Sequence, residues 1–298
     1  MREMGICELE ISTKIYHTLK VLPQGIKFYL HLEPYDSIYG YIGVYRYFQH
    51  TSNQHENIIH EVQMNDVKEL IQLIKNGDME QVRIIGLDDI LCHDYMYVFQ
   101  EISNLFAPRN VILCPEDSFY CATAIAVEWL INFGEIVSVA FAGYGGKAAT
   151  EEVYMALTIT KRYKPNQSFQ TFIKIKEWFE EIVQDKIHSF KPIIGDKIFH
   201  VESGIHVDGI LKNPMNNVAN PPEKVGQKTE IILGKHSGTK SIVAKCKELK
   251  LEPLESENML CLLGKVRCKS MQKRNSVTDQ EFVHLYEEVA YGCRFSSR

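Results

Sequence analysis

Short apolar runs alternate with amphipathic helical patterns over the first 160 residues of this 298-residue chain. Residues 82–85 and 111–114 read as buried strands, and helical patterns follow them over 95–106 and 121–133. This alternation indicates parallel strands joined by crossover helices, and both an open doubly wound sheet and a barrel satisfy it. The other predicted elements are strands over 6–11, 26–31 and 136–141 and helices over 66–76 and 151–160.

After Pro165 the pattern changes. Residues 169–183 predict one helix, and residues 240–250 and 278–290 predict the closing helices of a C-terminal appendage. Residues 195–238 are rich in Gly, Pro, Asn and His and are long for a connection, which is typical of functional segments or linkers. The aromatic stripe of the first helix is predicted to lie in a core rather than to bind a ligand: Phe169, Phe172, Trp178 and Phe179.

Composition argues against several classes of protein. The net charge is -5 with scattered Lys and Arg, which gives no basis for a nucleic-acid or membrane-surface partner. No apolar run approaches the roughly 20 residues of a membrane span, and the N-terminal residues lack the apolar core of a signal peptide. The eight cysteines form no C-x-x-C pair and are interpreted as reduced thiols. We therefore expect a cytoplasmic protein.

Three ordered motifs carry a resemblance to a known family. They are VESGIHVDGILKNP at 201–214, PEKVG at 222–226 and GKHSG at 234–238. Together they resemble the homocitrate and isopropylmalate synthase group, and most closely the homocitrate synthases that serve nitrogenase cofactor assembly. The resemblance covers residues 60–290 and includes CATAIAVEWLINFG at 121–134 and FAGYGGKAATEEVYMAL at 141–157.

The resemblance implies a (β/α)8 barrel followed by a C-terminal region that reaches over a partner's active site. Family members condense acetyl-CoA with a 2-oxo acid, using a divalent metal at the mouth of the barrel. The metal polarises the keto group, a base deprotonates the acetyl methyl, and an acid protonates the alkoxide. We expect a partial barrel over 1–165, a helical and loop linker over 166–238, and a small helical subdomain over 239–298.

The front of the family's barrel has no counterpart in the sequence. The family's first strand carries an Arg-Asp-Gly motif, whose Asp binds the metal, and this tripeptide occurs nowhere in the chain. Residues 5–11 (GICELEI) instead resemble the second strand. The predicted fold is therefore α/β, a TIM-barrel-derived barrel lacking its first strand, with a C-terminal α+β appendage. Such a barrel would leave strand edges unpaired.

The family's metal ligands are also altered. The seventh strand should end in His-x-His, and the alignment places Cys114 and Glu116 there. Both side-chain types bind divalent metals, so they are candidate ligands. The alternative is a buried cysteine beside a strand-end carboxylate. The turn GYGGK at 143–147 is shorter than the family's and lacks its metal-binding Asn.

Candidate catalytic and binding residues lie in the C-terminal motifs. His206 matches the family's catalytic histidine, while Asn217 replaces the tyrosine that usually follows eleven residues later. His236 and Lys235 occupy family positions near the substrate, and the alternative is an exposed glycine-flanked turn.

Asp88 and Asp89 follow a predicted barrel strand, where chemistry gathers in this fold. Capping of the next helix is the favoured alternative for them.

Two hypotheses follow. In the first, the chain is the omega-type subunit of a split homocitrate synthase acting on acetyl-CoA and 2-oxoglutarate. An alpha chain would supply the Arg-Asp-Gly strand and hold most of the divalent metal, either by completing this barrel or by bringing a complete barrel of its own. In the second, the chain is a non-catalytic or regulatory relative. Condensation on another 2-oxo acid also stays open.

Overall fold

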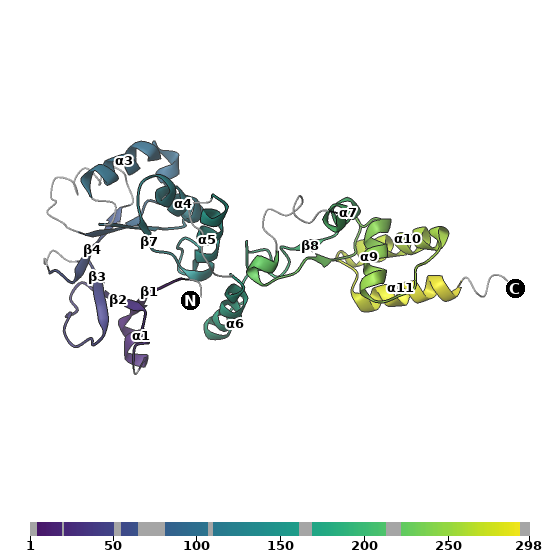
Figure 1. The fold of residues 1–298 in the computed structure, drawn as a ribbon, viewed down its shortest axis with the longest axis horizontal. Coiled ribbons are helices and arrows are strands. Elements are labelled where there is room, and N and C mark those ends of the chain that lie inside the picture. Colours follow the sequence, from purple (N-terminus) through teal and green to yellow (C-terminus); the bar gives the residue numbers. More distant parts are fainter. Residues whose placement is uncertain are drawn as a thin grey trace. The chain divides into compact units, whose positions relative to one another are not determined.

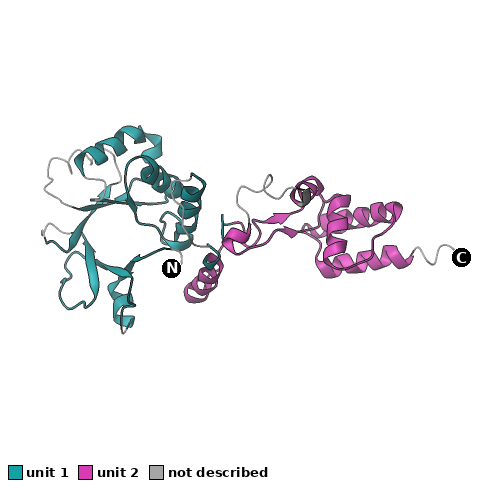
Figure 2. Ribbon diagram, in the orientation of Figure 1, with its two compact units in different colours: residues 1–171, 191–194 teal, residues 172–190, 195–298 magenta. Residues whose placement is uncertain are grey.

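The computed structural model describes residues 5–19, 21–50, 55–64, 81–106, 110–160, 169–212 and 222–292. The chain forms two compact units, which Figure 2 distinguishes by colour. Unit 1 comprises residues 1–171 and 191–194, and unit 2 comprises residues 172–190 and 195–298. The predicted three-part division at residues 165 and 238 stays a prediction. No helix within the described ranges has the length and apolar character needed to traverse a membrane.

A seven-stranded parallel sheet is the frame of unit 1 (Figure 1). Its strands lie side by side in sequence order, whereas a doubly wound sheet reverses its strand order partway. A complete (β/α)8 barrel needs eight such strands. The expected barrel-derived fold with one strand missing is therefore confirmed. The strands are β1 (Glu8–Ser12), β2 (Lys27–Leu32), β3 (Val44–Gln49), β4 (Ile58–Met64), β5 (Val82–Gly86), β6 (Val111–Pro115) and β7 (Ile136–Val137).

The sheet is curved but open. An ion pair, 2.7 Å between buried Arg83 Nη1 on β5 and Glu10 Oε2 on β1, joins strands that are four positions apart in the sheet. In a flat sheet these strands would lie about 19 Å apart at the usual spacing. The sheet must therefore curl, with Arg83 and Glu10 on its inner face. Among the described strands, β1 pairs only with β2 and β7 only with β6, so two edges remain free.

Helices cover the outer face of the later strands. Residues alternate along each strand, so Val82 and Ile84 point outward while Arg83 points inward. The outward side chains pack with Phe99 and Trp129 from two helices in one buried core. The helices of unit 1 are α1 (Thr13–Thr18), α3 (Tyr95–Leu105), α4 (Ala122–Asn132) and α5 (Thr150–Ile159), with 3₁₀ turns η2 (Ile90–Cys92) and η3 (Phe141–Gly143).

Local chemistry sets the bounds of these helices. The Asp94 carboxylate accepts the backbone N–H of Tyr97 and caps α3, as expected for an aspartate at this position. Helix α4 ends before Gly134, where the chain turns directly beneath the Trp129 indole. That indole donates to the Ile136 carbonyl at 3.2 Å, which holds the end of α4 against β7.

Unit 1 differs from the sequence prediction in several places, and β3 and β4 were not predicted at all. Residues 136–141 were expected to form one strand, but β7 ends at Val137 and a 3₁₀ turn begins at Phe141. The connection 33–43 between β2 and β3 contains only turns, although crossover connections usually carry a helix. The predicted helix over 66–76 lies outside the described residues.

Unit 2 combines a two-stranded parallel sheet with a helical cluster. The sheet pairs β8 (His200–Val201) with β9 (Glu230–Ile231). Buried Lys245 bridges two helices, because its ammonium lies 3.0 Å from Glu248 and 3.2 Å from Asp279. The C-terminal appendage is therefore α+β. Its helices are α6 (Thr171–Val183), α7 (Gly204–Lys212), η4 (Pro222–Val225), α9 (Thr239–Glu248), α10 (Ser256–Lys273) and α11 (Asp279–Gly292).

The prediction for this region was incomplete. Residues 195–238 were expected to be a long connection, yet they contain α7, η4 and both strands. No helix was predicted over the residues of α10. In the aromatic stripe of α6, Phe172 is fully buried as expected, but Trp178 is 62% exposed, so the stripe is only partly core.

We expect Gly134→Ala to destabilise unit 1. A Cβ at this position would lie 2.0 Å from the buried Trp129 ring, which cannot move without disturbing the core. Overpacking of this kind costs about 1–3 kcal/mol. Urea unfolding followed by circular dichroism measures the loss. The matched control is Gly264→Ala, where the added methyl meets nothing within 4 Å inside α10 and should stabilise by up to about 1 kcal/mol. Equal stability of Gly134→Ala and the parent would contradict this packing.

Candidate functional site

A chain of charged side chains lines the inner face of the curved sheet. Arg83 is 5% exposed and lies between the carboxylates of Glu10 and Glu61, at 2.7 and 3.4 Å. Its guanidinium also stacks over the Phe48 ring at 4.2 Å. The second oxygen of Glu61 lies 2.9 Å from His31 Nε2, and this hydrogen bond raises the pKa of His31. Sequence reasoning missed this cluster, although charged residues inside strands were a signal for it.

Cys114 and Glu116, the predicted metal ligands, lie at the carboxyl end of β6. Cys114 is buried, and its sulfur accepts a contact from Arg83 Nη2 at 3.6 Å. Glu116 accepts from Lys147 Nζ at 2.8 Å with one oxygen and from Gln63 Nε2 at 3.1 Å with the other. Burial would raise the pKa of Glu116, but the hydrogen bonds from Lys147 and Gln63 outweigh it and lower the pKa.

These residues do not fit a divalent metal. Each predicted ligand already faces a cation, the guanidinium of Arg83 or the ammonium of Lys147. Metal sites normally combine three or more protein ligands. Within the described parts of the chain, no group of three His, Cys, Asp or Glu side chains converges on one point. No chemical step through a metal is therefore assigned to this barrel.

A glycine turn after β7 positions Lys147. Its three glycines, at 143, 145 and 146, have φ between +68° and +72°, a backbone conformation that residues with a side chain rarely adopt. The carbonyl of Gly146 accepts the N–H of Asp117, and an antiparallel bridge joins Lys147 to Glu116. The turn is thus fastened to the end of β6, and Lys147 reaches back over the barrel mouth.

Glu151 supports the same turn from the first turn of α5. It is fully buried, and its Oε2 accepts the N–H of Ala142 at 3.0 Å, while its Oε1 has no hydrogen-bond partner. Burial raises the pKa of Glu151 to about 7, and the backbone hydrogen bonds only partly offset it. The side chain holds Ala142 at a φ of 58°, an unusual value for a residue with a Cβ.

Asp88 and Asp89, which follow β5, interact with different side chains. Asp88 lies close enough to Glu116 for its charge to act against the lowered pKa of that carboxyl. Asp89 precedes η2 but makes no side-chain capping bond, so the expected capping role is absent there. Its Oδ2 lies 3.1 Å from His93 Nε2, and Asp94 is the residue that caps α3.

In unit 2, residues 202–204 of the first motif pack against the motif at 234–238. A Cβ at Gly204 would lie 2.9 Å from the Gly238 Cα, so glycine is required for this approach. Glu202 Oε1 accepts the N–H of His236 at 2.7 Å. The Ser237 carbonyl accepts two bonds from Arg267, at 3.0 and 2.6 Å. The two motifs therefore form one structural unit, here called the motif junction, made of residues 202–204, 234–238 and Arg267.

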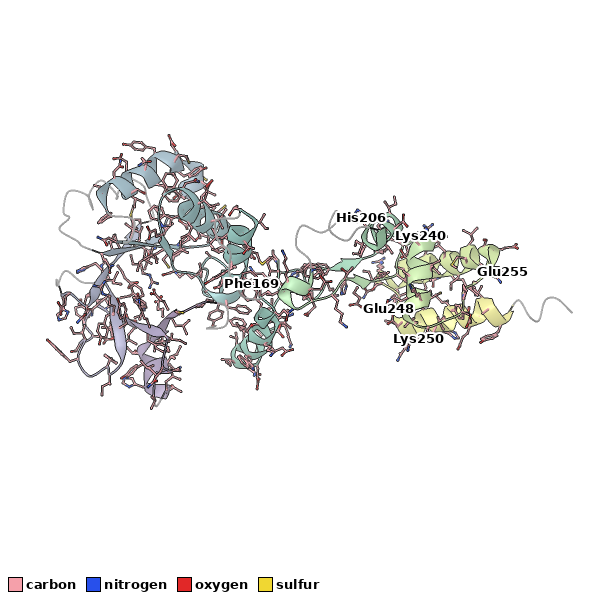
Figure 3. All side chains as sticks on the ribbon, viewed as in Figure 1. Phe169, His206, Lys240, Glu248, Lys250 and Glu255 are labelled. Carbon is pink, nitrogen blue, oxygen red and sulfur yellow. The ribbon has the colours of Figure 1, made fainter. Side chains whose placement is uncertain are left out.

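The motif junction sets the positions of the predicted catalytic and binding residues. His206 lies on α7 and is exposed, two residues after Gly204, rather than in a loop as expected. Figure 3 labels His206 on α7 and Lys240, the second residue of α9. Lys235 and His236 are exposed on the glycine-flanked turn. The junction thus brings the segments of His206 and His236 together. Cys114 and Glu116 belong to the other unit, and Asn217 lies outside the described residues.

We expect Glu202→Ala to loosen the turn at 234–238. The N–H of His236 would lose its acceptor, and removing one partner of a hydrogen bond to a charged group costs about 1–3 kcal/mol. Hydrogen exchange at the His236 amide should accelerate. Glu202→Gln, which keeps an acceptor oxygen, should retain most of the protection. Unchanged exchange in Glu202→Ala would argue against the bond.

The pH dependence of unfolding should change in Glu151→Gln. The pKa of Glu151 in the folded state is about 7, against an ordinary 4.5. The carboxyl therefore lowers the free energy of unfolding of the wild type as the pH rises from 4.5 to 7. Gln carries no such charge and still accepts from Ala142. Relative to Glu151→Gln, the wild type should therefore lose up to about 3 kcal/mol across this window. Urea unfolding at pH 4.5 and 8 measures the change, with exposed Glu56→Gln as control; parallel curves for all three proteins would refute it.

The comparisons with known proteins agree with the motifs. A family described as homocitrate synthase post-HMGL domain-like matches residues 193–274, which include the motif junction. The omega subunit of homocitrate synthase from Clostridium pasteurianum is 30% identical over 97% of this chain and 87% of its own length.

Other relatives are longer synthases. Homocitrate synthase AksA of Methanocaldococcus jannaschii is 34% identical over 62% of this chain, and 2-isopropylmalate synthase 2 of Caldanaerobacter subterraneus is 36% identical over 58%. The chain spans 46% of the length of each. A solved HMG-CoA lyase from Bacillus subtilis superposes with a TM-score of 0.42 at 12% identity, over 56% of this chain and 73% of that one. On the evidence of its similarity to the Clostridium subunit, the chain belongs to the homocitrate synthase family.

Proposed function

We propose that this chain is one subunit of a split homocitrate synthase. The assembled enzyme condenses acetyl-CoA with 2-oxoglutarate to give homocitrate, which serves nitrogenase cofactor assembly in the cytoplasm. A partner chain, of the alpha type, supplies the Arg-Asp-Gly strand and the divalent metal. This chain supplies seven barrel strands, the α+β appendage and His206.

The open seven-stranded sheet carries this proposal. A family whose barrel needs eight strands is represented by a chain whose described residues form seven, with β1 and β7 unpaired on their outer edges. Free edges of parallel strands present unsatisfied N–H and C=O groups that proteins normally cover. The sequence also lacks Arg-Asp-Gly, the motif that the family places on the missing strand.

An exposed apolar surface on unit 1 supports an association with another chain. In the helix-free connection between β2 and β3, Tyr35 is 100% exposed, Tyr39 81% and Ile42 86%. Such a concentration of large apolar side chains on one surface segment is typical of a protein–protein contact. In a complete barrel, a helix would normally cover this part of the sheet.

His206 is assigned the acid step. An exposed imidazole on a rigid helix is suited to protonate the alkoxide formed when the acetyl carbon attacks the keto group. Lys235 and His236 are assigned to substrate binding, because an ammonium and an imidazole donate hydrogen bonds to carboxylates and phosphates. On the same helix as His206, Asp208 forms an ion pair with Lys240 of α9, with 3.8 Å between Oδ1 and Nζ.

A second candidate function has a specific observation behind it. The lysine contact to Glu116 removes a metal ligand from the barrel mouth, as expected of a regulatory subunit that kept the scaffold and lost the catalytic centre. In that case, His206 would have no role in turnover. Condensation on a different 2-oxo acid is a further outcome that the assay distinguishes.

The test is to assay acetyl-CoA-dependent consumption of 2-oxoglutarate by this chain alone, by the partner alone and by the mixture. Activity is expected only in the mixture, and His206→Ala should reduce kcat about 100-fold or more because general acid catalysis contributes about 10²–10⁴-fold. The matched control is His284→Ala, which removes an exposed histidine of the same unit on α11 and should leave activity unchanged.

Two results would sink the catalytic assignment. One is a mixture that turns over no faster than the partner alone. The other is full activity of His206→Ala, which would favour the regulatory subunit. Replacing 2-oxoglutarate with shorter and longer 2-oxo acids in the same assay identifies the substrate.

A further inference from the structure

The barrel mouth of unit 1 contains a resident cation supplied by the chain itself. Lys147 Nζ lies 2.8 Å from Glu116 Oε1, and the lysine side chain is only 25% exposed. Gln63 donates to the remaining oxygen of Glu116 at 3.1 Å, so both carboxylate oxygens are occupied. A charge-assisted pair of this kind is about twice as strong as a neutral hydrogen bond.

The backbone holds Lys147 in this position rather than leaving it as a mobile surface lysine. The turn at 143–147 is closed by the bond from Lys147 N to the Gly143 carbonyl at 3.2 Å and tied to β6 by the bond from Asp117 N to the Gly146 carbonyl at 2.9 Å. The bridge between Lys147 and Glu116 adds a third tie. The ammonium is therefore built into the barrel mouth.

Two residues before Glu116, the inner face repeats the arrangement. The buried sulfur of Cys114 lies 3.6 Å from Arg83, whose guanidinium is itself anchored by Glu10 and Glu61. A divalent ion bound between Cys114 and Glu116 would thus meet one fixed positive charge on each side. The repulsion between like charges disfavours such an ion strongly in a partly buried site.

We propose that the ammonium of Lys147 takes the place of the divalent metal at this barrel mouth, so that this chain's own barrel excludes the catalytic ion. The consequence for the assembled enzyme rests on the function proposed above, in the arrangement where the alpha chain brings a complete barrel of its own: the metal would lie in that barrel, toward which this chain presents His206. The exclusion itself can be tested on this chain alone.

Co²⁺ is the probe, because its visible absorption reports coordination directly. Titrations compare the wild type with Lys147→His, Lys147→Arg and Glu116→Gln. Replacement by histidine removes the ammonium and adds a ligand beside Glu116, whereas arginine keeps the positive charge. Lys147→His is expected to bind Co²⁺ at least about tenfold more tightly than the wild type, since even outer-shell groups change metal affinity by about 10–100-fold. The wild type and Lys147→Arg should bind no more tightly than Glu116→Gln.

Two outcomes overturn the proposal. Wild-type binding that Glu116→Gln weakens about tenfold would show that a metal shares the site with Lys147. Equal binding by Lys147→His and Lys147→Arg would show that this is not a metal position. If Lys147→His does not fold, as judged by circular dichroism, the comparison of the wild type with Glu116→Gln still decides.

A reconstitution separates this inference from the proposed function. This chain, stripped with EDTA and desalted, should be fully active when mixed with metal-loaded partner. The reverse mixture, with stripped partner and untreated chain, should stay inactive until metal is added. Activity restored by untreated chain alone would overturn the inference. Inactivity of every mixture would count against the proposed function, while the Co²⁺ titration would still decide the exclusion of metal.

Discussion

The buried guanidinium of Arg83 is the interaction on which unit 1 depends. It joins β5 to β1 through Glu10 and to β4 through Glu61, and it packs on Phe48 from β3. A sheet with one strand missing has no continuous ring of backbone hydrogen bonds to impose curvature. Side chains crossing the inner face can take over part of that task. Because a charge so buried is costly unless paired, loss of either carboxylate would leave Arg83 with a single anionic partner and weaken the link between the strands.

Carboxylates at the barrel mouth are also paired with side-chain cations. In a metal-dependent barrel, carboxylates and imidazoles converge because a divalent ion coordinates both and neutralises the carboxylates. Here the inward carboxylates meet side-chain cations instead, Arg83 for Glu10 and Glu61 and Lys147 for Glu116. Each of these three carboxylates therefore has a cationic partner without an added ion. This explains how the chain can keep the barrel scaffold while departing from the family at the residues that bind metal.

The sequence predicted the elements whose apolar periodicity was unbroken. Helices α3 and α4 and strand β6 were placed to within about two residues, because nothing interrupts their patterns. Strands β3 (VYRYFQ) and β4 (IIHEVQM) were missed, since their inward charges, Arg46 and Glu61, mask the apolar alternation. Helix α7 was missed because its glycines suggested a loop. Cys114 and Glu116 were correctly placed at one strand end. Their cationic partners, Arg83 and Lys147, each lie 31 positions away in the sequence, a separation that local patterns cannot reveal.

The motifs that identify the family owe their form to packing as much as to chemistry. Gly204 is required by the close approach of the Gly238 backbone, and Glu202 accepts the backbone N–H of His236. His206, Lys235 and His236 are exposed on this framework. A subunit that donates a catalytic histidine to another chain needs this combination, a rigid interior and an exposed reactive group. The motif junction can therefore stay unchanged while the barrel mouth diverges, because the two are built from separate sets of residues.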